Sequence, residues 1–306
     1  MTTPWARGAE PQGSLRLSGA WALYPMAVRW AEEFQNSYPD IHISVSAGGT
    51  GKGMSDVLAG RVDISMCSRE VAPLEAARGA VAITVCKDAV VAVINARNPV
   101  WQDLQRKGVG KETLAALWLR GEVQTWGAVA GTAREAPLHI YTRSDACGAA
   151  ETWANYLGGT QAGLKGARVF GDPGIRDAVR RDPLALGYNN VNYAYDPRTG
   201  KPAAGLTILP LDVNGNGVLE KEEDFYRTRE ELVAAIRRGD YPSPPARDLY
   251  FVVKGSPTNE PLRAFLRWVL TDGQKFVPES GYLHPPAKQR RAGLEALGFP
   301  ASASGQ

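Results

Sequence analysis

The chain has 306 residues, 44% hydrophobic and 22% charged, within the range of soluble globular proteins and long enough for two domains. Its 35 basic and 32 acidic residues leave a net charge of +3, too balanced for binding to a nucleic-acid backbone. No apolar run reaches the roughly 20 residues that span a bilayer, and the start lacks the basic and apolar regions of a signal peptide. Residues 1–13 are predicted to be a disordered segment.

Predicted strands and helices alternate along the chain, which favours an α/β fold with parallel sheets covered by helices on both faces. In the first helix, Leu23, Ala27, Trp30 and Phe34 recur at steps of three and four and form one apolar face. Strands are predicted at 41–47, 62–68, 138–144, 167–171, 206–211 and 248–255, helices at 53–60, 149–157 and around 175–179, and a pair of strands within 80–95.

Two segments are predicted to cross between domains, at 89–100 and 241–255, where strands meet proline-containing breaks. They predict a first lobe from 14–91 plus 247–306 and an inserted second lobe at 92–246. Two crossings form a hinge that suits closure around a ligand. A single large α/β domain with internal loops is the alternative that the spacing leaves open.

Three turns rich in glycine or hydroxyl residues precede predicted helices, at 18–25, 46–55 and 143–151. Each can direct backbone N–H groups and the positive end of a helix at an oxyanion. Arg143 would add a bidentate cationic partner, and Asp145 could fix its orientation. The three turns together predict a site for one tetrahedral anion.

Other chemistries are weakly supported. The turn at 46–55 is not a nucleotide-binding P-loop, because Gly53 stands where that motif needs serine or threonine. A phosphatase-like enzyme with Cys147 or Ser144 as nucleophile lacks a histidine base in a motif context. The three cysteines have no metal-binding spacing, and buried free thiols are favoured over a bridge between Cys67 and Cys86.

Four segments in one order, 18–34, 48–70, 143–157 and 265–283, resemble the phosphate-binding proteins of ABC importers over nearly the whole chain. The resemblance implies the two-lobed periplasmic binding protein fold (type II). It also implies anion contacts from Leu23, Tyr24, Thr50, Gly51, Ser68, Arg143, Asp145, Cys147, Gly148 and Ala149.

This chain departs from the pattern of that family at several of these positions. Leu23 stands where threonine is usual, Cys147 and Ala149 replace hydroxyl residues, and Ser68 takes the place of a key aspartate. An aspartate acceptor favours hydrogen phosphate and rejects sulfate, so Ser68 is expected to weaken this rejection. Asp88 and Asp145 are the candidates for the missing acceptor.

The resemblance implies an extracytoplasmic receptor, free or lipid-anchored, that acts as a monomer and performs no catalysis. It would capture inorganic phosphate and present it to an ABC permease, without a catalytic cofactor and without binding nucleic acid. Sulfate, arsenate, molybdate and tungstate remain alternative ligands. A sensor or adhesion protein with the same ligand is a further alternative.

Residues 212–223 match the twelve-residue calcium loop in the type and spacing of their oxygen ligands. The predicted ligands of a structural Ca²⁺ are Asp212, Asn214, Asn216, Val218, Glu220 and Glu223, with Gly217 at the sharp turn. An ordinary Asn-Gly turn before an acidic helix start is the alternative.

Overall fold

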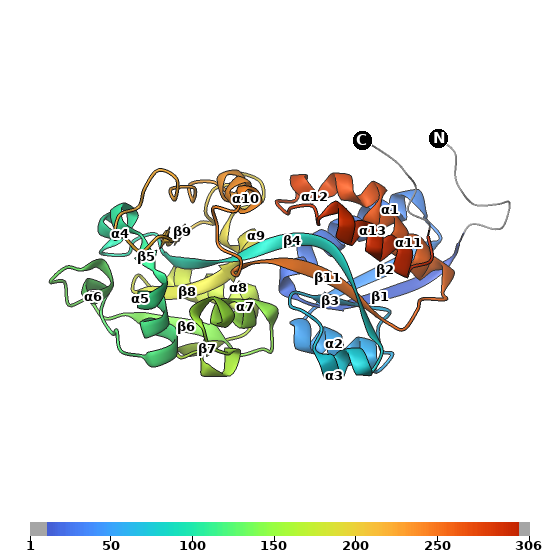
Figure 1. Ribbon diagram of the computed structural model, residues 1–306, viewed down its shortest axis with the longest axis horizontal. Coiled ribbons are helices and arrows are strands. Elements are labelled where there is room, and N and C mark those ends of the chain that lie inside the picture. The colour runs from blue at the N-terminus through green and yellow to red at the C-terminus, as the bar shows by residue number, and fades with distance from the viewer. Residues whose placement is uncertain (1–10, 300–306) are drawn as a thin grey trace.

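The computed structural model describes residues 11–299, which form two α/β lobes joined by a shared sheet (Figure 1). Residues 1–10 of the predicted disordered segment lie outside the described residues. Gly13, the last residue of that segment, instead begins strand β1 (Gly13–Gly19) and pairs with Ile41. β1 was not predicted from the sequence, because only Leu15 and Leu17 mark its apolar face.

The first lobe is built on strands in the order β2-β1-β3-β11-β4. Besides β1, these are β2 (Ile41–Ala47), β3 (Ile64–Cys67), β11 (Ala246–Lys254) and the first part of β4 (Ala80–Asn95). One face carries α1 (Tyr24–Ser37), α11 (Glu260–Leu270), α12 (Phe276–Glu279) and α13 (Ala287–Ala296), and the other carries α2 (Thr50–Leu58) and α3 (Pro73–Ala77) (Figure 1).

The second lobe continues the sheet in the order β4-β8-β6-β7. Its strands are β6 (His139–Arg143), β7 (Ala167–Val169), β8 (Ala185–Asn190) and β9 (Leu206–Ile208), with β5 (Val109–Gly110) and β10 (Leu211–Asp212) as a separate pair. Its helices are α4 (Trp101–Lys107), α5 (Lys111–Ala115), α6 (Trp126–Ala130), α7 (Gly148–Leu157), α8 (Gly171–Arg181), α9 (Val191–Ala194) and α10 (Arg229–Arg238).

Strand β4 is one continuous strand of 16 residues, so the prediction of a strand pair within 80–95 was wrong. The charged residues Lys87 and Asp88 resemble a break in the sequence, but both pair with β11. Residues 80–89 pair with β11 and residues 90–94 pair with β8, so β4 runs from one lobe into the other (Figure 1). Both pairings are antiparallel, which makes the sheet mixed rather than wholly parallel as predicted.

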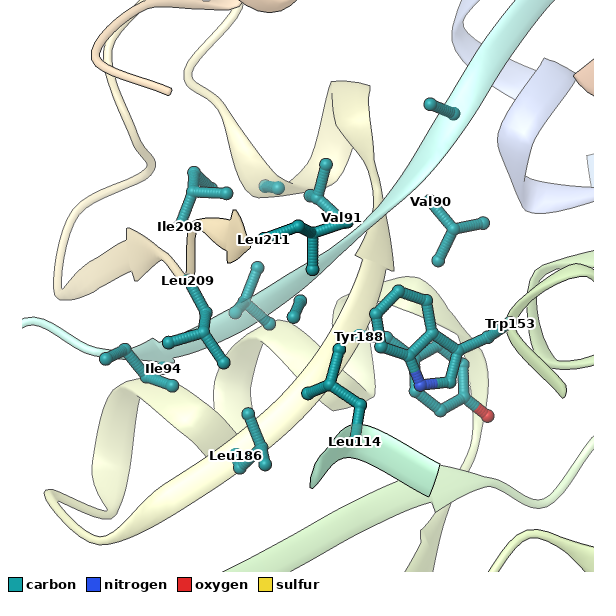
Figure 2. Close-up of a cluster of buried hydrophobic side chains, with 14 of the residues drawn as sticks. Val90, Val91, Ile94, Leu114, Trp153, Leu186, Tyr188, Ile208, Leu209 and Leu211 are labelled. Atoms are coloured by element: carbon teal, nitrogen blue, oxygen red, sulfur yellow. The ribbon is translucent and has the colours of Figure 1, made fainter. Parts of the chain in front are cut away.

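Each lobe has its own aromatic core. In the first, Trp30 and Phe34 of α1 pack against Phe251 and Phe265, with ring centroids 5.6 Å and 5.2 Å apart respectively. In the second, the Trp153 and Tyr188 rings stack at 5.8 Å beneath the apolar side chains of β4 (Figure 2). Truncation of such a buried aromatic residue costs about 3 to 5 kcal/mol of stability.

Cys67, Cys86 and Cys147 are all buried and free, which confirms the prediction of free thiols. Within residues 11–299, none of the helices has the length and apolar character needed to cross a bilayer.

Candidate functional site

Helices α2 of the first lobe and α7 of the second lobe begin next to each other. The Gly51 N–H donates to the Ala146 carbonyl oxygen at 3.0 Å, across the boundary between the lobes. Gly148 lies so close to Ser68 that a Cβ on it would be 2.2 Å from the Ser68 carbonyl oxygen. Only glycine permits this approach, so the structure shows the lobes in contact around these turns.

Neither helix start is closed by a side chain. The N-cap residues of α2 and α7, Gly49 and Cys147, make no side-chain capping hydrogen bond. Gly49 has a φ of 89°, which turns the chain tightly into α2. Apart from Gly51, whose N–H already donates to Ala146, the first turn of each helix therefore has backbone N–H groups without an intrahelical acceptor, together with the positive end of the helix dipole, at the junction of the lobes.

Hydroxyl groups lie between the two helix starts. The Thr50 and Ser68 hydroxyl oxygens are 3.2 Å apart, and the Ser68 N–H donates to Thr50 Oγ1 at 3.2 Å. Both residues are buried, with exposed fractions of 1% and 2%. The structure thus brings Thr50, Gly51 and Ser68 together with Gly148 and Ala149, while a hydroxyl can both donate to and accept from an oxyanion.

Arg143, at the end of β6, is the buried cation of this region. Its Nε and Nη2 donate to the two carboxylate oxygens of Asp145 at 2.8 Å and 2.6 Å. Its Nη1 donates to Asp172 Oδ2 at 2.6 Å. Burial opposes the charge, but the two carboxylates outweigh burial and raise the pKa of Arg143, so the guanidinium remains charged.

Asp172 was not predicted from the sequence as a site residue. This residue lies in the first turn of α8, directly after β7, which is parallel to β6. Neighbouring parallel strands end at the same edge of a sheet, and ligand sites form there. That rule, applied to the end of the predicted strand 167–171, could have identified Asp172.

The first predicted anion turn differs from the other two. Residues 21–23 form a short 3₁₀ turn before α1, in which the Leu23 N–H donates to the Ala20 carbonyl at 3.2 Å. The Tyr24 N–H donates to the Trp21 carbonyl. The backbone donors of Leu23 and Tyr24 are therefore engaged within the turn, and their predicted contact with an anion requires this turn to rearrange.

Cys147 does not have the properties of a nucleophile. Burial raises the pKa of its thiol to about 12, although the Arg143 charge opposes this. Its N–H donates to Gln161 Oε1 at 3.2 Å. A neutral, buried thiol at this position contributes packing at the start of α7.

A family model described as the PBP superfamily domain matches residues 6–273, most of the chain. The chain belongs to the PBP superfamily. The phosphate-binding protein PstS of Bacillus subtilis is 29% identical over 208 residues, which cover 68% of this chain and 65% of that protein. PstS of Pseudomonas aeruginosa is 24% identical over 321 residues, covering 96% of this chain and 90% of that protein.

A solved structure of an ABC-type phosphate transport receptor from Vibrio cholerae has the same fold, with a TM-score of 0.63 at 17% identity. The match covers 89% of this chain and all of that receptor. The two-lobed α/β architecture predicted from the sequence is therefore confirmed as a PBP superfamily fold.

Asp88, one candidate for the missing acceptor of this PBP chain, lies on the crossing strand β4 and pairs with Arg247 of β11. Arg247 Nε donates to Asp88 Oδ1 at 2.9 Å. Burial raises the pKa of Asp88 to about 6, against the opposing effect of Arg247. Arg247 also donates to Thr152 Oγ1 of α7 at 3.1 Å and to the side-chain oxygen of Asn190. This pair therefore anchors the crossing strands to the second lobe.

A cavity of about 340 Å³ lies between the lobes, and its wall includes Glu151, Thr152 and Asn155 of α7. The cations in its wall already have partners: Arg69 contacts Glu75 at 2.7 Å, and Lys87 contacts Asp248 at 3.0 Å. Arg69 also reaches Glu151 of α7 at 3.3 Å, across the two lobes. None of the residues predicted to contact the anion lines this cavity.

The predicted calcium loop folds around its first and last carboxylates. Asp212 accepts hydrogen bonds from the backbone N–H groups of Gly215, Asn216 and Gly217 at 2.8 to 3.1 Å. Glu223 Oε1 accepts from the N–H of Val213 at 2.9 Å. Within residues 11–299, no group of three or more His, Cys, Asp or Glu side chains is arranged to hold a metal ion. The calcium site stays a prediction.

Proposed function

We propose that this protein is an extracytoplasmic receptor that captures inorganic phosphate between its lobes and delivers it to an ABC permease. One observation carries the proposal: the starts of α2 and α7 and the Thr50 and Ser68 hydroxyls meet between the lobes, and Asp145, the partner of buried Arg143, lies against Gly49 at the start of α2. N–H donors, hydroxyls and a guanidinium are the groups that bind phosphate in proteins. The names of the PstS relatives support the same ligand.

The side chains near the junction favour binding of the anion without catalysis. Burial raises the pKa of the Cys147 thiol to about 12, far from the thiolate that a nucleophile requires. His139 pairs with Asp182 at 2.8 Å, and His284 lies near Gln274 at 3.2 Å, so neither contacts Cys147 or Ser144. We infer that the protein acts as a monomer, free or lipid-anchored, and releases the anion unchanged.

A different tetrahedral oxyanion is the second candidate ligand. Ser68 is uncharged, whereas the family that the sequence resembles has an aspartate at the corresponding position. A hydroxyl at that position is compatible with sulfate, molybdate or tungstate as well as with phosphate.

Titration calorimetry of the purified protein with phosphate, sulfate, molybdate and tungstate tests the proposal, with a phosphate-ester turnover assay alongside. We expect the tightest binding for phosphate and no release of product from the ester. Tighter binding of another oxyanion would support the second candidate. Ester turnover that increases with protein concentration would support the enzyme instead.

We also propose that residues 212–223 bind a structural Ca²⁺. The support is the spacing of oxygen ligands and the inward direction of the carboxylates of Asp212 and Glu223, which are 6% and 7% exposed.

A melting-temperature comparison in calcium and in chelator tests this proposal. Calcium is expected to raise the melting temperature of the parent, and Glu223→Gln should remove most of this effect. Glu222→Gln is the matched control, because Glu222 is exposed and lies outside the predicted ligand set. Equal melting temperatures of the parent in calcium and in chelator would show that the segment is an ordinary turn.

A further inference from the structure

A second cavity, of about 400 Å³, has walls from both lobes. The first lobe contributes residues of α1 and the end of α12, and the second contributes residues of α9 and the start of α10 (Figure 1). The polar residues of the wall are Arg29, Asn192, Arg229, Glu279 and Ser280. This cavity shares no residue with the candidate anion site.

Arg229, the first residue of α10, is the buried cation of this cavity. Its side chain is only 7% exposed, and its Nε–H has no hydrogen-bond partner in the part of the chain that the structure describes. Its Nη1 donates to Asn192 Oδ1 and its Nη2 donates to Glu230 Oε1, both at 3.3 Å. Hydrogen bonds between charged groups are usually shorter, at about 2.7 to 2.9 Å.

The surroundings of Arg229 differ from those of two other buried arginines. Arg143 has Asp172 at 2.6 Å, and Arg247 has Asp88 at 2.9 Å, and both of these carboxylates are buried. The carboxylate nearest to Arg229 belongs to Glu230, which is 63% exposed and so is screened by water. A buried cation with such a weak partner favours the binding of an anion from outside the chain.

The free donors belong to the Arg229 side chain and not to the helix start. The Arg229 backbone N–H donates to the Gly200 carbonyl at 2.7 Å, and the Thr228 side chain caps α10 by accepting from the Glu231 N–H. Gly281 of the first lobe makes room for the guanidinium, because a Cβ there would lie 2.6 Å from Arg229 Nε. The guanidinium of the second lobe is therefore packed directly against the first.

The size and the wall of the cavity favour an organic anion over an inorganic one. One water molecule takes about 30 Å³ in the liquid, so an ion of phosphate size would fill only a part of 400 Å³. Pro25 and Pro197 add apolar surface to the wall. A guanidinium binds a carboxylate through two parallel hydrogen bonds, and Glu279 can accept a hydrogen bond from a hydroxyl group on the same ligand.

We infer that this cavity is a second ligand site, for a small organic carboxylate that carries a hydroxyl group and is bound by Arg229. The inference goes beyond the proposed function, which concerns phosphate at the other site, and does not depend on it. Because both lobes form the wall, a carboxylate bound here contacts both and stabilises their present arrangement.

Titration calorimetry with lactate tests the inference on the parent, Arg229→Gln and Arg238→Gln. Lactate carries both the carboxylate and the hydroxyl group. Arg238 is the matched control, because it lies on the same helix with a side chain that is 58% exposed. We expect saturable binding to the parent, a loss of affinity on the order of tenfold or more in Arg229→Gln, and the parent affinity in Arg238→Gln.

No saturable binding of lactate to the parent, or equal affinities of the parent and Arg229→Gln, would overturn the inference. Phosphate is titrated in the same series. Loss of phosphate binding in Arg229→Gln would also overturn the inference, because the cavity would then be the phosphate site. Binding of lactate by a parent that does not bind phosphate would overturn the proposed function and leave the inference intact.

A crystal structure of the parent with lactate gives a test that needs no variant. We expect the lactate carboxylate within hydrogen-bond distance of the Arg229 guanidinium. Lactate bound at Arg143 and not at Arg229 would overturn the inference even if Arg229→Gln did not fold.

Discussion

The two lobes contribute different chemistry to the same junction. The first lobe provides uncharged groups, the Thr50 and Ser68 hydroxyls and the start of α2. The second lobe provides the charged group, Arg143, together with the carboxylates that orient it. Charge recognition is therefore built inside one lobe, while closure of the other lobe adds neutral donors.

This division separates two properties of a binding protein, its selectivity among anions and the stability of its closed form. Arg143 and its carboxylates are fixed by the strands of the second lobe and need no lobe movement to assemble. Thr50 and Gly51 belong to the first lobe, and the Gly51 N–H contacts the second lobe through its hydrogen bond to the Ala146 carbonyl. Changes to Arg143 and its carboxylates should alter which anion binds, and changes where the lobes touch should alter how firmly the closed form is held.

Arg143→Ala should have the largest effect. Loss of the guanidinium should weaken phosphate binding by about 2 to 5 kcal/mol. It also leaves Asp145 and Asp172 buried without their partner, which should lower the free energy of unfolding by about 3 to 5 kcal/mol. Calorimetry and chemical denaturation measure the two effects, with exposed Arg168→Ala as the control. A phosphate affinity of Arg143→Ala equal to that of the parent would show that the anion binds at another site.

Gly148→Ala should have an intermediate effect. Its new methyl group would lie 2.2 Å from the Ser68 carbonyl oxygen, so the lobes cannot approach as closely. We expect phosphate affinity to fall by about 1 to 3 kcal/mol. Small-angle scattering should show a more open form in saturating phosphate. Gly163→Ala is the matched control, because a methyl group there has ordinary contacts. Closure to the parent dimensions would refute this account of the junction.

Thr50→Val should have the smallest effect. The hydroxyl contacts Ser68 and is uncharged, so its loss should reduce phosphate affinity by about 1 kcal/mol. The phosphate-to-sulfate ratio should stay near the parent value, because no charge changes. Exposed Thr258→Val controls for the substitution itself in the same calorimetric series. A large change in the ratio would contradict the assignment of charge recognition to the second lobe.

The sequence predicted those parts of the molecule that depend on local patterns. Apolar runs located most strands, and glycine or hydroxyl residues located the turns before α2 and α7. The turn before α1 looked equivalent, but its donors are used by a 3₁₀ turn whose hydrogen bonds depend on backbone angles. The residue types in a turn do not indicate whether its backbone N–H groups are free or are bonded within the turn.

Contacts between distant polar residues could not be predicted. In the sequence, Asp172 resembles any acidic residue in the first turn of a helix, and Arg247 resembles any basic residue near the start of a strand. Their partners, Arg143 and Asp88, become neighbours only when β6, β7 and the crossing strands assemble. The strand-end rule marks Asp172 as a residue near a possible ligand site, but a single sequence does not indicate that Asp172 pairs with Arg143 or that Asp88 pairs with Arg247.

The position of β11 in the sheet affects the order in which the sheets of the two lobes can form during synthesis. β11 lies between β3 and β4, so the first sheet has a gap until residues 246–254 have been synthesised. The strands of the second lobe all precede residue 213 and can pair before that point. Until then the edges of β3 and β4 remain open for pairing with other chains. The lobe whose synthesis begins first is therefore the last whose sheet can be completed.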